Sequence, residues 1–125
     1  MSFELRDYLQ HILDEAEYLL ATSDGLTPEK FLADATLQRA FVRSLEIIGE
    51  ATKKLPENFR AAHPEIEWRS IARMRDRLIH GYFGVDYQLV WEVTQTKVPE
   101  LHSVLPADSF RAILIRANRS RSTAR

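Results

Sequence analysis

Residues 35–56, ATLQRAFVRSLEIIGEATKKLP, decide the fold of this chain. Apolar side chains recur there every three or four residues, which is the spacing of one face of a helix. Pro56 cannot continue a helix, so the pattern predicts a helix over roughly 35–54. Gly49 lowers the stability of such a helix, and its presence indicates that a neighbouring helix packs closely against it. The members of the stripe are Leu37, Phe41, Leu45, Ile48, Ala51 and Leu55.

A similar stripe precedes this segment and predicts a first helix over roughly 3–22. The pattern stops before Ser23, Asp24 and Gly25, which are turn residues. Thr27 followed by Pro28 is typical of a helix start and predicts a short helical turn. The first stripe consists of Leu5, Leu9, Ile12, Leu13, Ala16, Leu19 and Leu20.

Two further helices are predicted in the second half of the chain. Pro56 and Pro64 bracket a short turn or helix, after which Trp68, Ile71, Met74 and Leu78 predict a third major helix over roughly 66–80. Asp86 is a plausible N-cap for a fourth helix, which Pro99 should kink and Pro106 should end. No β pattern competes with these helices, so we predict an all-α protein, an antiparallel bundle of four main helices with short extra helices.

The charge is unevenly distributed along the chain. Residues 109–125 contain five arginines and no acid, so residues 1–108 carry 12 of the 17 basic residues and all 18 acidic residues. We therefore expect a helical domain over 1–108 and a basic, arginine-rich C-terminal extension over 109–125. Arginines of this tail can bind a polyanion such as RNA, or they can simply be solvated; the candidates are Arg116, Arg119 and Arg121.

Composition excludes several kinds of site. The chain has no cysteine, so it has no disulfide, no thiolate metal site and no cysteine nucleophile. Its first residues are charged and are followed by neither a signal peptide pattern nor a membrane span, so we expect a cytoplasmic protein. No glycine-rich phosphate loop and no cluster of metal ligands is visible, so we expect no cofactor.

The candidate site is residues 75–82, RDRLIHGY, which gathers an arginine, a carboxylate, a histidine and a phenol. On one ideal helix Arg75 would interrupt the apolar stripe, where it must find a partner such as Glu46 or Glu50. His80 would lie about 140° away on a polar face with Arg73, Asp76 and Arg77. Arg75 and His80 can therefore share a site only if the helix ends or distorts near His80-Gly81, or if two copies of the segment meet across a dimer.

The order Arg75, four residues, His80, one residue and Tyr82 resembles the signature of HepT-like proteins, a branch of the HEPN superfamily of helical ribonucleases. Residues 44–51, SLEIIGEA, and 78–86, LIHGYFGVD, also resemble stretches of that branch. The resemblance covers most of the chain. It implies a HEPN-type bundle and a toxin of a toxin–antitoxin pair, whose antitoxin is a minimal nucleotidyltransferase.

The resemblance also implies roles for individual residues. Members are metal-independent endoribonucleases acting on mRNA or tRNA, and they form homodimers in which two motifs line one cleft. His80 would be the general acid/base and Arg75 the phosphate ligand, which suits the proton transfer and developing charge of RNA cleavage. Asp76 would hold one of them in position, and Arg73 and Arg77 could contact RNA.

Tyr82 has a separate implied role as the residue that the antitoxin modifies with AMP. A tethered nucleotide would occupy the phosphate site and repel RNA. Tyr82 can instead be a packing residue at the end of the bundle. An alternative function also remains open, in which the chain is a non-catalytic helical module that binds a nucleotidyltransferase and presents substrate to it, with the same residues forming the interface.

Overall fold

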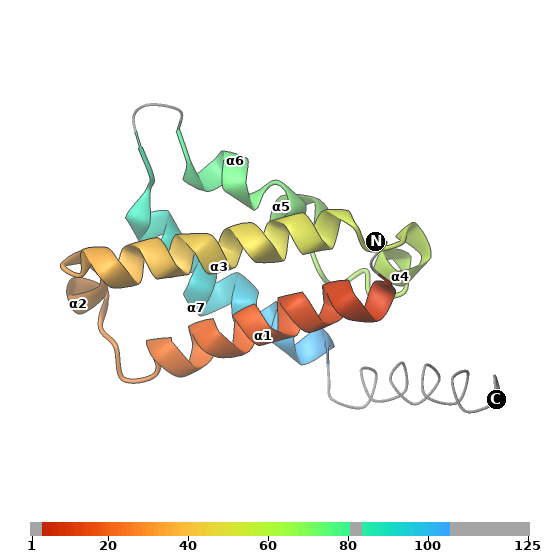
Figure 1. Cartoon of the computed structure of the whole chain (residues 1–125), viewed down its shortest axis with the longest axis horizontal. Coiled ribbons are helices and arrows are strands. Elements are labelled where there is room, and N and C mark those ends of the chain that lie inside the picture. The colour runs from red at the N-terminus through yellow and green to blue at the C-terminus, as the bar shows by residue number, and fades with distance from the viewer. Residues whose placement is uncertain (1–3, 81–83, 106–125) are drawn as a thin grey trace.

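The computed structural model describes residues 4–80 and 84–105, and over these residues the chain is a bundle of helices (Figure 1). α1 (Leu5–Ser23) and α3 (Ala35–Lys53) run antiparallel and pack on each other, joined by the short α2 (Pro28–Leu32). α4 (Glu57–Ala61) follows, and α5 (Trp68–Ala72) and α6 (Met74–Leu78) return along α3. α7 (Tyr87–Val104) closes the bundle against α1. The all-α architecture predicted from the sequence is thereby confirmed.

Three helices start directly after residues whose side chains cap the first turn. The Thr27 side chain accepts a hydrogen bond from the backbone N–H of Lys30 at 3.2 Å, which starts α2 as predicted. Asp34 caps α3 and Asp86 caps α7 in the same way, through Leu37 N–H at 3.0 Å and Leu89 N–H at 3.1 Å. α7 continues through Pro99 to Val104, and Pro106 lies outside the described residues.

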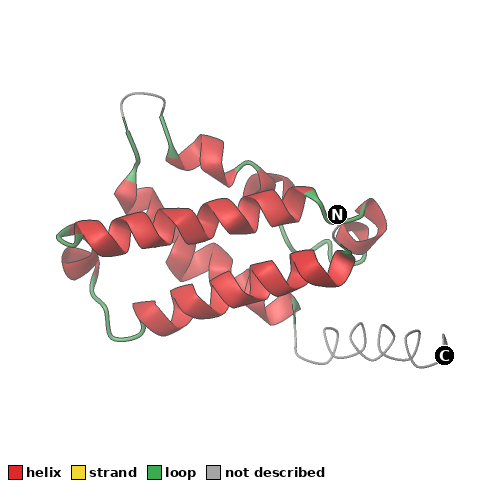
Figure 2. Ribbon diagram, in the orientation of Figure 1, coloured by secondary structure: helices red, strands yellow, loops and turns green. Residues whose placement is uncertain are grey.

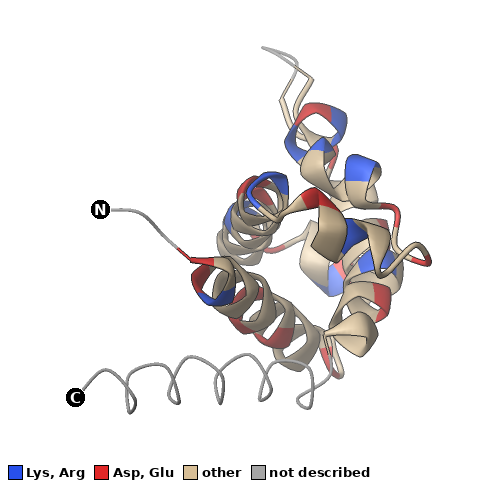
Figure 3. Ribbon diagram, turned by 90° about the vertical axis from the view of Figure 1, so that its right-hand side faces the viewer, with Lys and Arg blue, Asp and Glu red and all other residues tan. Residues whose placement is uncertain are grey.

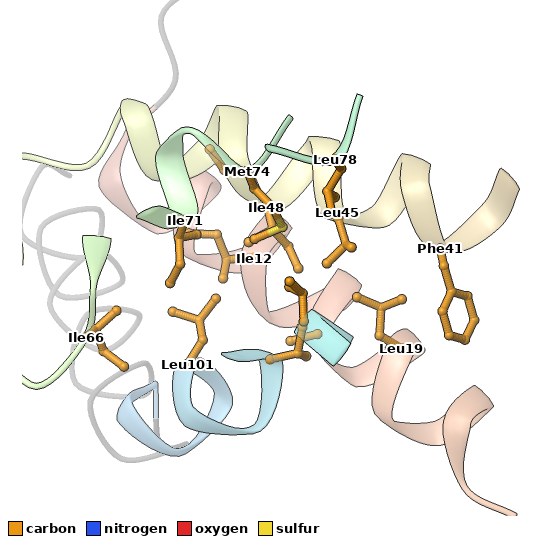
Figure 4. Close-up of a cluster of buried hydrophobic side chains, with 14 of the residues drawn as sticks. Ile12, Leu19, Phe41, Leu45, Ile48, Ile66, Ile71, Met74, Leu78 and Leu101 are labelled. Carbon is orange, nitrogen blue, oxygen red and sulfur yellow. The ribbon is translucent and has the colours of Figure 1, made fainter. Parts of the chain in front are cut away.

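The core lies between α1, α3, α7 and the segment formed by α5 and α6 (Figure 4). It is built from the apolar stripes of α1, α3 and α7, with Phe31 of α2 inserted between α3 and Trp91. Met74 and Leu78 point from α6 into the cluster that contains Leu45 and Ile48 of α3. This anchoring fixes α6, the helix that carries the candidate site.

The prediction of one long helix over 66–80 is wrong in detail. Two short helices, α5 and α6, occupy this range and are separated at Arg73 (Figure 2). The break faces Gly49 of α3, where an added Cβ would lie 3.2 Å from the carbonyl oxygen of Ile71. The close helix contact expected at Gly49 is therefore present, and it is made with the backbone at the break.

Candidate active site

His80 stands just beyond a helix end. α6 ends at Leu78, and Ile79 has an extended backbone that forms an isolated antiparallel bridge with Val85. The N–H of His80 donates to the carbonyl of Gly84 at 2.9 Å, and the N–H of Asp86 donates to the carbonyl of Leu78 at 2.9 Å. The sequence left open whether the third predicted helix, over 66–80, ends or distorts near His80. The helix ends at Leu78, two residues before the predicted end.

Gly84 makes this turn back to α7 possible. Its φ of +95° lies in the region that side chains disfavour, so glycine is the residue suited to it. Residues 81–83, including Tyr82, lie outside the described residues. The bridge therefore fixes the backbone of His80 relative to α6 and to the start of α7.

Arg75 does not face the core, contrary to the helical wheel. Its side chain is 57% exposed, and its Nε lies 3.7 Å from Oε2 of Glu46 on α3. Arg75 lies four residues after Ile71, beside the buried stripe of Ile71, Met74 and Leu78, and its long side chain reaches past that stripe to solvent and to α3. Glu46 was one of the two predicted partners; the other, Glu50, pairs instead with Lys53 at 3.1 Å.

We call the segment formed by α5, α6 and the bridge between Ile79 and Val85 the arm. The remaining candidate residues on the arm are exposed. Arg73, Asp76, Arg77 and His80 all face solvent, as the polar face of the wheel predicted. Asp76 makes no hydrogen bond or ion pair with Arg75 or His80 within the described residues. Figure 3 shows both basic and acidic positions on the helix just below the grey loop. Arg116, Arg119 and Arg121 lie outside the described residues.

Exposed arginine and histidine side chains, such as those of Arg75 and His80, suit the binding of an anion. A guanidinium group can hold a phosphate through paired hydrogen bonds, while an imidazole can accept and return a proton near neutrality. The ion pair with Glu46 is longer than a hydrogen bond, so it holds Arg75 loosely. Sequence reasoning named Glu46 only as a structural partner, and its position beside a candidate catalytic arginine became visible with the fold.

Among residues 4–80 and 84–105, no three His, Asp or Glu side chains are grouped so that they could hold a metal ion. None of the helices described is long and apolar enough to span a bilayer.

Comparison with known proteins identifies the family. The model of the family described as "Ribonuclease HepT-like" matches residues 8–107. The chain belongs to the HepT-like ribonuclease family. The arm formed by α5, α6 and the bridge carries Arg75 and His80, two residues of the pattern by which the sequence resembles HepT-like proteins.

Several relatives are similar over most of their length. A candidate RNase of Caldanaerobacter subterraneus subsp. tengcongensis is 54% identical over 96 residues, which are 77% of this chain and 86% of that protein. A protein of Thermococcus cleftensis named as ribonuclease HepT is 46% identical over 77% of this chain and 87% of its own. A candidate RNase of Methanocaldococcus jannaschii is 42% identical over 77% and 79%. No solved structure gives a significant match.

Proposed function

We propose that this HepT-like ribonuclease cleaves cellular RNA, mRNA or tRNA, without a metal ion, using Arg75 and His80. The observation that carries the proposal is that both side chains are exposed on one short arm, which Met74 and Leu78 hold to the core. A substrate phosphate can reach this arm from solvent.

The chemistry uses the 2′-OH of the RNA itself. The 2′-oxygen attacks the adjacent phosphorus, the bond to the 5′-oxygen breaks, and the products are a 2′,3′-cyclic phosphate and a 5′-hydroxyl. One group must take the proton of the 2′-OH and one must give a proton to the 5′-oxygen. His80 serves as this general acid/base, and Arg75 binds the charged phosphate oxygens as their negative charge increases. Asp76, exposed next to Arg75, is a supporting residue.

A homodimer supplies the second proton carrier. Each chain has one candidate histidine at the site, and two copies related by a two-fold axis would bring two His80 side chains to one cleft. One imidazole then acts as base while the other, protonated, acts as acid. The exposed polar side of the arm, with Arg75, Asp76 and His80, is accessible for such pairing.

We further propose that the chain is the toxin of a pair whose antitoxin is a minimal nucleotidyltransferase. Tyr82, two residues after His80, is the proposed acceptor of AMP. The attached phosphate would compete with RNA for Arg75. Arginines of the 109–125 extension, Arg116, Arg119 and Arg121, remain predicted contacts to RNA.

The catalytic test compares RNA integrity and cell growth on expression of the wild type, Arg75→Ala and His80→Ala. His102→Ala and Arg39→Ala are matched controls, because His102 pairs with Glu17 at 3.7 Å on the far side of the bundle and Arg39 is exposed on α3. We expect the two site variants to abolish both cleavage and toxicity and the two controls to retain them. Cleavage that persists in both site variants would reject this active site.

The modification test uses the purified chain with its nucleotidyltransferase and ATP. The mass should rise by one or more AMP units in the wild type and not in Tyr82→Phe. An equal adduct on Tyr82→Phe would reject Tyr82 as the acceptor. A wild type that is modified but never cleaves RNA would favour the alternative, a helical module that binds the nucleotidyltransferase without catalysis.

A further inference from the structure

Three arginines on the arm are spaced four residues apart: Arg69 on α5, Arg73 at the break and Arg77 on α6. All three are exposed, whereas Trp68, Ile71, Met74 and Leu78 of the same segment are buried. Residues four apart on a helix share a face. The arginines therefore line the side of the arm that is opposite to the core.

The backbone keeps this alignment through the break. The N–H of Arg73 donates to the carbonyl of Arg69 at 3.1 Å, and the N–H of Arg77 donates to the carbonyl of Arg73 at 3.2 Å. Both are bonds of the α-helical kind, so successive arginines stay one turn apart although α5 and α6 are separate helices. We call this row of Arg69, Arg73 and Arg77 the arginine column.

The column is uncompensated within the described part of the chain. Arg75 pairs with Glu46 and Lys97 pairs with Glu67, but no carboxylate forms an ion pair with any member of the column. Asp76 is exposed beside it and pairs with none of the three. This matters because residues 1–108 carry 18 acidic and 12 basic residues, so a row of unpaired arginines is a local exception on an acidic domain.

We propose that the arginine column is a phosphate track that holds the RNA strand on one side of the cleaved bond. The inference rests on the proposed ribonuclease function and adds to it Arg69 and the direction of the strand along α6 and α5. The column spans about 12 Å at the helical rise of 1.5 Å per residue. Charges that repeat one helical turn apart fit a polymer of regularly spaced anions, and the buried side chains of Ile71, Met74 and Leu78 hold the segment that carries them against the core.

The test measures binding of a short single-stranded RNA at several salt concentrations, in a His80→Ala background so that the RNA is not cleaved. Arg69→Gln removes the column residue farthest along the chain from His80, and Lys30→Gln on α2 is the matched control for loss of one exposed positive charge. Glutamine has a helix propensity similar to those of arginine and lysine, so folding should be preserved. Each lost phosphate contact should make the slope of log affinity against log salt shallower by about 0.7 for single-stranded RNA.

We expect a slope change of about 0.7 for Arg69→Gln and about 2 for the variant with all three arginines replaced, against none for Lys30→Gln. In the catalytically competent background, Arg69→Gln should lower kcat/KM for an oligonucleotide but not for a dinucleotide, which is too short to reach Arg69. The phosphate track would be contradicted if Arg69→Gln left the slope of log affinity against log salt unchanged. It would also be contradicted if this variant lowered kcat/KM equally for the oligonucleotide and the dinucleotide. A wild type that binds RNA through the column but cleaves neither substrate would reject the proposed catalysis alone.

Discussion

The Nε atom of Arg75 on α6 lies 3.7 Å from Oε2 of Glu46 on α3, and the arginine is 57% exposed while Glu46 is 26% exposed. The pair links the candidate phosphate ligand to the central helix of the bundle. Because it is solvent-accessible and longer than a hydrogen bond, its contribution to folding is small, about 0–1 kcal/mol. Because the pair contributes little to folding, a role of Arg75 in RNA cleavage can be measured separately from its role in the fold.

Arg75→Gln and Glu46→Gln should each change the free energy of unfolding by less than about 1 kcal/mol, measured by urea denaturation. Cleavage should be abolished by Arg75→Gln and only reduced by Glu46→Gln, because the carboxylate positions the guanidinium without touching phosphate. If both variants lose stability and activity to the same degree, Arg75 is a structural residue and not a phosphate ligand.

Gly84→Ala should impair cleavage more than folding. The φ of +95° at Gly84 is strained for alanine by about 1–2 kcal/mol, although there is open space for the added Cβ. The strain falls on the residue whose carbonyl accepts from the N–H of His80. Gly25→Ala is the matched control, since Gly25 has a φ of +76° and equally open surroundings in the turn after α1. Both variants should lose similar stability, and only Gly84→Ala should lose cleavage; equal activities would show that the bridge does not position His80.

Gly49→Ala should move the arm away from α3. The added Cβ would lie 3.2 Å from the carbonyl oxygen of Ile71, which belongs to backbone and cannot rotate away. Overpacking of about 1–3 kcal/mol outweighs a gain in helix propensity of about 1 kcal/mol. We expect a lower melting temperature together with reduced cleavage, and a more stable variant with full activity would contradict the tight contact.

Two buried threonines should respond oppositely to replacement by valine. Thr52 on α3 is fully buried, and its hydroxyl has no hydrogen-bond partner in the described part of the chain. Thr94 on α7 is equally buried, but its hydroxyl donates to the carbonyl of Val90 at 2.9 Å. Thr52→Val should raise the free energy of unfolding by about 1 kcal/mol and Thr94→Val should lower it by a similar amount. Chemical denaturation of both variants measures these changes. A lower free energy of unfolding in Thr52→Val would mean that the Thr52 hydroxyl has a hydrogen-bond partner.

Much of the fold was predictable because its signals are local. Apolar spacing located α1 and α3 to within about two residues, and Thr27 and Asp86 marked the starts of α2 and α7 through their own side chains. Even Gly49 indicated correctly that a neighbour comes close. These features depend on residues near one another in the chain, which is the information that periodicity carries.

The break at Arg73 could not be predicted in this way. Trp68, Ile71, Met74 and Leu78 fit one continuous helix, and the sequence around Arg73 contains neither proline nor glycine. The break coincides with the approach of the arm to Gly49, a tertiary contact that overrides local propensity. The helical wheel also placed Arg75 on the core side, whereas its side chain extends to the surface, where it pairs with Glu46.

The bridge between Ile79 and Val85 also separates activity from global stability. Two backbone hydrogen bonds flank it, and both of its residues are only half-buried, whereas the bundle is held by a fully buried core. Segments with few buried contacts open at a lower free energy than the whole domain. Mild denaturant should therefore release His80 while α1, α3 and α7 remain folded, and the amide hydrogens of His80 and Asp86 should exchange earlier than those of the core helices. The protein can then be inactive while it is still folded, so an inactivation curve would report the opening of the bridge and a circular dichroism curve would report the bundle.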